Sequence, residues 1–268
     1  MRKFKVVLDV VMVCAALFVF GCGQANGKGL KLKMTSPVDA SYEQAQELVS
    51  SGKLLEARSA FQQIVTEHPD YKEIEKVQND LYSLNMRILF SNIQSPEAIV
   101  HEVKVGDTLG KISKQYNVTM DLIKTCNSLK GETVRVGQKL RIWTGKFSIL
   151  VNKSQNTLML KSGEEVLKVY SVSTGANNST PVGSFKIVTK LENPVWFKAG
   201  AVIPPESPDN VLGTRWLGFN LEGYGIHGTV EPDKIGQQVT AGCVRMRNDD
   251  VEELYKVVPR GTEVTVVD

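Results

Sequence analysis

Two short segments near the C-terminus carry residue types suited to thiol chemistry. His227 stands in the sequence Gly-Ile-His-Gly-Thr, and Cys243 follows sixteen positions later in Thr-Ala-Gly-Cys-Val-Arg-Met. Thiol acyl transfer needs a thiolate nucleophile and an adjacent imidazole that accepts the thiol proton. A Cys–His ion pair holds the thiol pKa well below its ordinary value of about 8.5. The two segments therefore predict a cysteine nucleophile with a histidine base.

The neighbours of these two residues supply the other parts of such a site. The carbonyl of Gly228 can accept a hydrogen bond from the second imidazole nitrogen, so no carboxylate is needed to set the tautomer. Gly242 lets backbone N–H groups approach a developing oxyanion closely. In a strand, Arg245 faces the same side as Cys243, where it suits a substrate carboxylate. The residue types alone leave open a buried structural thiol at Cys243.

The region that carries these segments, residues 147–268, has the pattern of a mainly-β domain. Short alternating apolar runs are separated by Gly, Asn and Pro, which is typical of many short strands. Strands are expected at 148–152, 157–160, 166–172, 184–188 and 263–267, and one helix at 249–257. These strands and their turns must position the histidine and the cysteine.

This region resembles the L,D-transpeptidase catalytic domain, often called YkuD-type. The resemblance rests on residues 173–175, 180–185, 193–196, 210–218, 227–229 and 242–246, which follow in the family's order. It implies a sandwich-like, mainly-β catalytic domain over residues 146–268 and a ping-pong reaction. Cys243 attacks the amide between the third residue of a peptidoglycan tetrapeptide stem and the terminal D-alanine. An amine on a second stem then resolves the acyl-enzyme into a crosslink.

The same resemblance implies a role for each residue of the motif. His227 is the base, the Gly228 carbonyl orients it, the Gly242 and Cys243 amides form the oxyanion hole, and Arg245 assists. Further contacts to the substrate are expected from Arg215, Trp216, Trp196 and Thr240. The sequence leaves open whether the two tryptophans line the cleft or pack in the core. Thr240 and Ala241 stand where family members commonly carry serine and histidine.

Residues 98–144 resemble the LysM module. Alternating apolar residues at both ends predict two strands, and Thr108 and Thr119 are the expected N-caps of two short helices between them. The resemblance implies a small α+β domain of βααβ order. It also implies binding to the N-acetylglucosamine-containing glycan of peptidoglycan.

Residues 39–94 show three apolar stripes at helical spacing. Ser41 and Gln44 form an expected capping box at the start of the first helix, and His68 ends the second. The first two helices resemble one tetratricopeptide-type hairpin, which the third helix is expected to cap because a single repeat leaves a face exposed. The sequence leaves two roles open for this segment: a spacer or a surface that docks a partner.

The first residues have the order of an export signal: a basic start, an apolar run and small residues. Residues 1–21 are expected to be a lipoprotein signal peptide, since residues 19–22 resemble a lipobox that ends in Cys22. A lipid on Cys22 is expected to anchor the exported protein to a membrane of the cell envelope, in the periplasm or at the cell-wall face. Residues 22–38 suit a linker. A non-cleaved anchor helix and a plain signal peptide are the alternatives.

Composition narrows the functional classes. The 268 residues carry a net charge of +3 with 23% charged residues, so neither a nucleic-acid partner nor wholesale disorder is expected. Four cysteines are too few for a disulfide framework. The sequence lacks metal-ligand spacings, so no metal and no cofactor are expected. The oligomeric state stays open, and so do two rival functions: an L,D-carboxypeptidase that uses the same thiol, and a non-catalytic glycan-binding lipoprotein.

Overall fold

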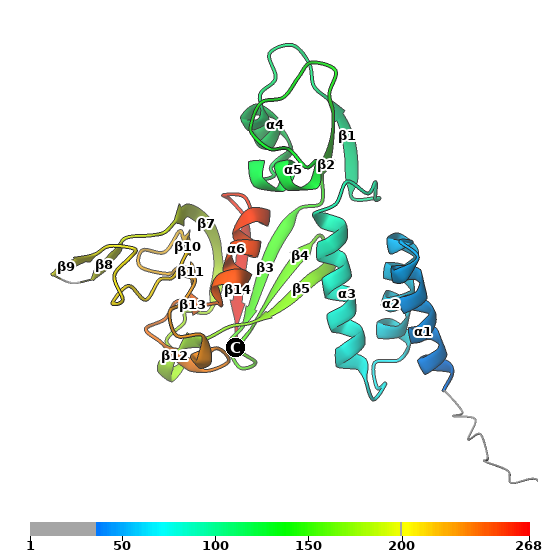
Figure 1. Ribbon diagram of the computed structural model, residues 1–268. Coiled ribbons are helices and arrows are strands. Elements are labelled where there is room, and N and C mark those ends of the chain that lie inside the picture. The colour runs from blue at the N-terminus through cyan, green and yellow to red at the C-terminus, as the bar shows by residue number, and fades with distance from the viewer. Residues whose placement is uncertain (1–35, 199) are drawn as a thin grey trace, which may run out of the picture. The chain divides into compact units, whose positions relative to one another are not determined.

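The computed structural model describes residues 36–198 and 200–268 (Figure 1). The expected signal peptide, Cys22 and all but the last three residues of the expected linker lie outside the described residues. Within the described part, no helix is long and apolar enough to cross a membrane.

The three apolar stripes form three helices, α1 (Pro37–Ser50), α2 (Leu54–Glu67) and α3 (Ile74–Leu89). The capping box expected at Ser41 is wrong. Ser36 accepts a hydrogen bond from the Asp39 N–H, and the Asp39 carboxylate accepts one from the Ser36 N–H. Pro37 has its φ already fixed for the first helical position, so the helix begins five residues earlier than expected.

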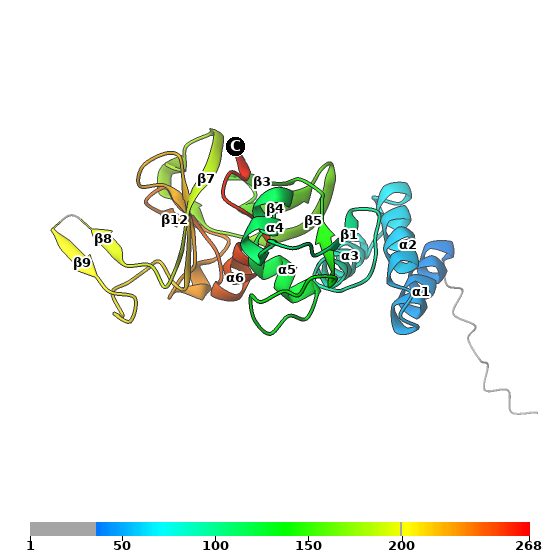
Figure 2. The ribbon, with the colours of Figure 1, turned by 90° about the horizontal axis from the view of Figure 1, so that it is seen from above.

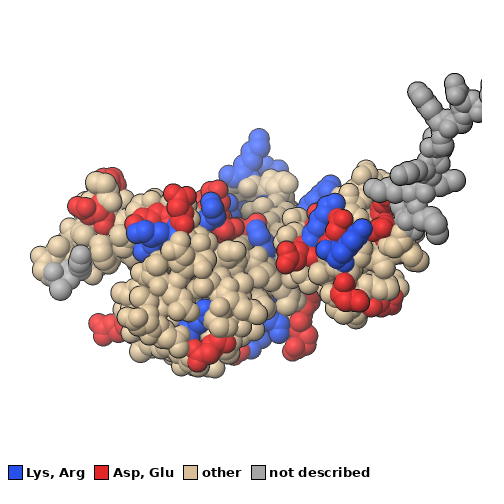
Figure 3. Space-filling view, turned by 90° about the horizontal axis from the view of Figure 1, so that it is seen from below, with Lys and Arg blue, Asp and Glu red and all other residues tan. Residues whose placement is uncertain are grey.

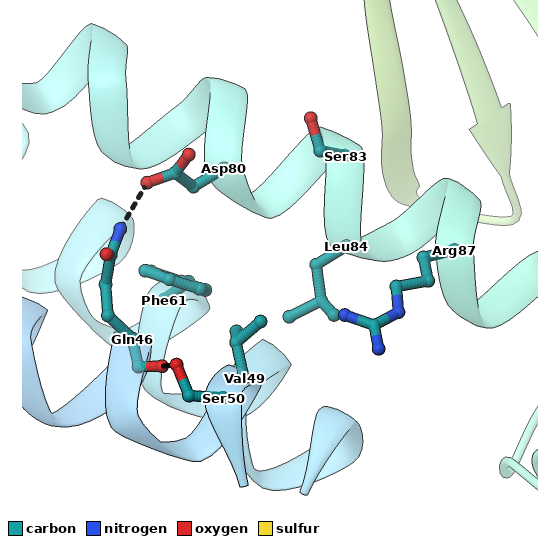
Figure 4. A pocket seen from close by; sticks show the side chains of 8 residues that line it. All are labelled: Gln46, Val49, Ser50, Phe61, Asp80, Ser83, Leu84 and Arg87. Atoms are coloured by element: carbon teal, nitrogen blue, oxygen red, sulfur yellow. Dashed lines mark hydrogen bonds between the residues drawn. The ribbon is translucent and has the colours of Figure 1, made fainter. Parts of the chain in front are cut away.

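Apolar residues from all three helices form one core, which includes Tyr42, Phe61, Val77 and Leu84. A hollow of about 220 Å³ opens beside this core. Figure 4 shows that side chains of α1 and α3 face it across Phe61, with the Gln46 amide donating to Asp80 at 2.9 Å.

The helical segment is attached to the β domain through α3. The Asn85 amide donates to the carbonyls of Val166 and Leu167, at 3.3 Å each, on strand β5 (Glu165–Ser171). Asn85 is buried, so these bonds satisfy a polar group that has little access to water.

The LysM segment has the expected βααβ order. Strands β1 (Ala98–Glu102) and β2 (Lys139–Trp143) pair antiparallel, with α4 (Leu109–Tyr116) and α5 (Met120–Cys126) between them. Both expected N-caps are confirmed, because the Thr108 hydroxyl accepts from the Lys111 N–H and the Thr119 hydroxyl from the Leu122 N–H.

The remaining chain forms a mainly-β domain, as predicted, around one curled eight-stranded sheet instead of two separate layers (Figures 1 and 2). Its spatial order is β13 (Val244–Arg245), β11 (Gly225–His227), β10 (Arg215–Phe219), β7 (Gly183–Glu192), β14 (Glu263–Val267), β3 (Phe147–Asn152), β4 (Thr157–Ser162) and β5. The β14–β3 and β11–β13 pairs are parallel. Ten-residue strand β7 joins the two halves, and the right-handed twist of strands gives a long sheet its curl.

Smaller elements complete the domain. Helix α6 (Asn248–Val257) packs against β10 and β11, near the predicted position. Two-stranded pairs form between β6 (Thr174–Gly175) and β12 (Gln238–Thr240), and between β8 (Trp196–Lys198) and β9 (Ala201–Ile203). Two 3-10 turns lie at Ala176–Asn178 and Pro232–Lys234.

LysM and the β domain share one hydrophobic core. Trp143 of β2 stacks on Phe147 of β3 with ring centroids 6.3 Å apart, and buried residues of both modules belong to the same cluster. The Thr119 hydroxyl donates to the Lys256 carbonyl of α6. Removing LysM would therefore expose apolar surface of the β domain.

Charged side chains of both signs are interspersed on the face seen in Figure 3. Neither sign forms a continuous field on that face, in keeping with the small net charge of +3.

Candidate active site

Cys243 opens onto a hollow of about 300 Å³ at one end of the curled sheet. The lining is largely apolar: Leu191, Pro194, Val195, Trp196, Phe197, Leu212, Trp216, Gly223 and Cys243. Both tryptophans therefore line the cleft. Leu191 and Trp216 are register partners on β7 and β10, which places their side chains on the same face of the sheet.

His227 lies on β11 beside this hollow and is only 4% exposed. Its Nδ1 is 2.7 Å from the carbonyl oxygen of Gly228. Because that carbonyl can only accept, Nδ1 carries the proton and Nε2 keeps a lone pair. The Trp216 ring stacks on the imidazole at 5.9 Å, which holds the ring plane.

Cys243 follows a tight turn that Thr240 braces. The Thr240 hydroxyl donates to the Cys243 carbonyl at 2.6 Å and accepts from the Gly242 N–H at 3.2 Å. Gly242 has φ of 134°, and a Cβ there would lie 2.7 Å from the Tyr224 ring, so only glycine fits. Thr240 thus holds the nucleophile's backbone and does not line the hollow.

The same geometry revises the expected oxyanion hole. The Gly242 N–H, one of its two expected donors, is bonded to Thr240 in this structure. An oxyanion would receive the Gly242 N–H only if that bond opened, since one N–H donates fully to one acceptor. The Cys243 N–H is the other expected donor.

The expected thiolate–imidazolium pair is not what the resting site favours. Burial is the main cause that lowers the pKa of His227 to about 4, and the charge of Arg245 adds to it, although the backbone carbonyls of Gly228 and Leu212 oppose it. Burial also raises the pKa of Cys243, against the Gly225 N–H and the positive charge of Arg245. Desolvation disfavours whichever form is charged, so at neutral pH the site holds a thiol and a neutral imidazole.

We expect alkylation of Cys243 by iodoacetamide to be slow below pH 7 and to rise steadily above pH 9. The reason is that the thiolate is the reactive form and burial raises the thiol pKa. Peptide mapping of the alkylated chain over pH 5–10 measures the rate at this one cysteine. A rate that is already at its plateau at pH 6 would contradict the neutral pair.

Two arginines of the predicted site lie elsewhere. Arg245 donates to the Glu231 carboxylate at 3.0 Å and does not line the hollow. Arg215 precedes Trp216 on β10, so its side chain points to the opposite face, over the Tyr255 ring of α6. The structure therefore does not bring Arg215 to the cleft where substrate contact was expected.

Sequence reasoning missed three residues that shape this site: Tyr224, Glu231 and Asn248. Tyr224 confines the Gly242 turn, Glu231 holds Arg245, and Asn248 bonds to the backbone beside His227. Asn248 lies just before the predicted helix at 249–257 and two residues after the Cys-Val-Arg-Met segment, which is the one sequence signal that could have found it.

The β domain that carries this thiol matches the catalytic domain of a family of acyl-transferring enzymes. The L,D-transpeptidase catalytic domain matches residues 146–266, and the LysM domain matches residues 101–143. The putative L,D-transpeptidase YqjB of Bacillus subtilis (strain 168) is 43% identical over 126 residues, which cover 45% of this chain and 70% of that protein. The putative L,D-transpeptidase YkuD of the same strain is 32% identical over 175 residues, covering 63% of this chain and 98% of that protein.

The chain belongs to the L,D-transpeptidase family, and its C-terminal β domain is the catalytic domain of that family. Among solved structures, an L,D-transpeptidase from Mycobacterium smegmatis aligns with a TM-score of 0.39 and 22% identity, covering 50% of this chain and 65% of that one.

Proposed function

We propose that the protein crosslinks peptidoglycan through an acyl-enzyme on Cys243, with His227 as the base. The observation that carries this proposal is the bond from His227 Nδ1 to the Gly228 carbonyl, beside a hollow that exposes the Cys243 thiol. This bond leaves Nε2 as the only ring nitrogen able to accept a proton.

The first half-reaction forms a thioester. Cys243 Sγ attacks the carbonyl carbon between the third stem residue and D-alanine, while the thiol proton passes to His227 Nε2. Because both groups start neutral, proton transfer accompanies the attack. The Cys243 N–H stabilises the tetrahedral oxyanion. The C–N bond then breaks, and the D-alanine amine leaves with the proton from His227.

The second half-reaction forms the crosslink. An amine of a second stem attacks the thioester carbonyl, and His227 removes the proton from that amine. The C–S bond breaks, the thiol regains its proton, and a new amide remains. Trp196, Trp216 and the apolar residues around them hold the donor stem in the hollow, where burial of stem carbons favours binding.

Incubation of residues 36–268, which form one compact unit, with a disaccharide-tetrapeptide tests this function. Mass spectrometry should detect crosslinked dimers and free D-alanine. Shortened monomers alone would indicate an L,D-carboxypeptidase, in which water resolves the thioester. Unchanged substrate would contradict both enzymatic functions and favour the hypothesis of a non-catalytic, glycan-binding lipoprotein.

We also propose that LysM holds the enzyme on the glycan. The loops that follow β1 and precede β2 lie together, since the Gly137 N–H donates to the Val103 carbonyl at 2.8 Å. They expose Val105 and Val136, which are 87% and 66% accessible. Exposed apolar side chains on adjoining loops suit the apolar face of a sugar ring.

We expect Val136→Asp to weaken binding to purified sacculi by about tenfold, because it replaces an apolar contact with a charge. Turnover of a small tetrapeptide should not change, since Val136 lies outside the catalytic hollow. Co-sedimentation measures binding, and Val188→Asp, at a 47% exposed valine of β7, is the matched control. Equal losses in both variants would contradict a glycan site on these loops.

The N-terminal part is proposed as an anchor and a spacer. Lipidation of Cys22 after cleavage of residues 1–21 would place the enzyme at a membrane of the cell envelope, and the residue order of the first 22 positions supports this. Cell fractionation of the Cys22→Ala variant tests this anchor. The variant should be lost from the membrane fraction, and its full retention there would contradict lipid anchoring at Cys22. We propose that α1 and α2 form a single tetratricopeptide-like hairpin capped by α3, which is supported by the core that the three helices share.

A further inference from the structure

Asn248, the first residue of α6, makes three side-chain hydrogen bonds to backbone groups near the catalytic histidine. Its Oδ1 accepts from the Thr229 N–H at 3.0 Å and from the Thr214 N–H at 3.2 Å. Its Nδ2 donates to the Thr229 carbonyl at 2.9 Å. One amide thereby ties together the start of α6, the chain that follows β11 and the chain that enters β10.

One of these bonds acts on the group that holds the imidazole. The Thr229 N–H and the Gly228 C=O belong to the same peptide unit, which is planar, with the two groups pointing in opposite directions. Fixing the N–H on Asn248 therefore fixes the direction of the C=O, which accepts from His227 Nδ1 at 2.7 Å. The N–H bond also polarises the peptide and makes its carbonyl a better acceptor.

The amide of Asn248 is enclosed where it acts. A Cβ at Gly228 would lie 2.2 Å from Asn248 Oδ1, and a Cβ at Gly213 would lie 2.3 Å from it. Two glycines thus let the backbone approach this one oxygen closely. The oxygen has little room to rotate away from the Thr229 N–H.

We propose that Asn248 is a positioning residue that sets the tautomer of His227 through the Gly228–Thr229 peptide. Its amide oxygen holds the peptide so that Gly228 faces Nδ1, the proton stays on Nδ1, and Nε2 remains free for the thiol proton. The catalytic consequence rests on the proposed function, whereas the tautomer itself is a property of the resting protein.

Nitrogen-15 NMR of the imidazole rings tests this directly at pH 7. The chain has three histidines, so His68→Gln and His101→Gln assign the His227 signals. The wild type should show a protonated Nδ1 and an unprotonated Nε2. Asn248→Leu, which keeps the approximate volume but has no acceptor, should shift much of the population to the Nε2–H tautomer. Asn248→Asp loses the donor to the Thr229 carbonyl but keeps an acceptor for both N–H groups, so it should retain the wild-type tautomer.

The control is Asp249→Ala, which changes the next, exposed residue of the same helical turn. A wild-type tautomer in folded Asn248→Leu would overturn the proposal, and so would an equal shift in Asp249→Ala. If Asn248→Leu does not fold, Asn248→Asp still decides, because loss of the Nδ1–H form there contradicts the role of the acceptor.

Activity provides a second, separate readout. Asn248→Leu should lower kcat by about 10–100-fold with KM nearly unchanged, because the base is mispositioned while the apolar hollow stays intact. Asn248→Asp should recover most of this loss. A wild type without turnover would overturn the proposed function and leave the tautomer result standing; a normal kcat in Asn248→Leu would overturn the positioning role alone.

Discussion

Replacing Cys243 by alanine should lower the release of D-alanine from a tetrapeptide stem by about 10⁴-fold or more while leaving the fold intact. Among the described residues that line the hollow, the thiol is the only nucleophile, and removal of a nucleophile from an acyl-transfer site costs about this much or more. The side chain is small and lies partly buried at the wall of the hollow, so its loss leaves little unfilled volume.

Cys126→Ala is the matched control for this variant. Cys126 is the other cysteine in the described part of the chain, 2% exposed, and its thiol donates to the Arg141 carbonyl within LysM. Its removal should leave turnover within about twofold, since it has no access to substrate. Turnover by Cys243→Ala at a rate near wild type, measured as free D-alanine, would remove the cysteine from the mechanism.

His227→Gln should lower kcat/KM by about 10³-fold, because it removes the group that accepts the thiol proton. The wild-type rate should hold down to about pH 5 and fall as the imidazole takes up a proton at about pH 4. The rate falls only in acid because burial favours the neutral imidazole, which is the form able to accept a proton. Rates measured from pH 3.5 to 8 define this acidic limb, which the variant should lack.

The control for the histidine is His101→Gln. His101 lies in LysM, where it bonds to Tyr116 and Asp107, far in sequence from the thiol. This variant should keep the acidic limb of the wild type. A limb that survives in His227→Gln would mean that another group titrates there and that His227 is not the base.

Much of the architecture was predictable because it is encoded locally. The helical stripes, the two threonine caps of LysM and the strands of the β domain follow from spacing within a few residues. The start of α1 was misplaced by five residues because Ser36 and Ser41 both carry capping side chains, and the choice depended on Pro37 and Asp39. The shared core of LysM and the β domain could not be read from such patterns, since it depends on contacts between modules.

The site was predictable where short motifs define it and not where tertiary contacts do. Cys243, His227 and the Gly228 carbonyl came from two segments, and the structure shows the expected imidazole–carbonyl bond. The sequence could not show that Arg215 lies over the Tyr255 ring, because only the register of β10 decides which face it takes. A lowered thiol pKa was expected, whereas burial, which no local pattern reports, outweighs the Gly225 N–H and the charge of Arg245 and raises it.

Asn248 illustrates the same limit. Its partners lie 19 and 34 positions away in the sequence, so no local spacing connects it to the histidine.

Intact-mass spectrometry of the protein, quenched with acid during turnover of a tetrapeptide stem, tests the central claim most directly. Acid preserves a thioester, and fragmentation locates it. The account predicts a protein species heavier by the acyl tripeptide, without D-alanine, with the added mass on Cys243, and its disappearance when an acceptor amine is supplied. Turnover with no such species, or with the added mass on another residue, would contradict the thiol acyl-enzyme.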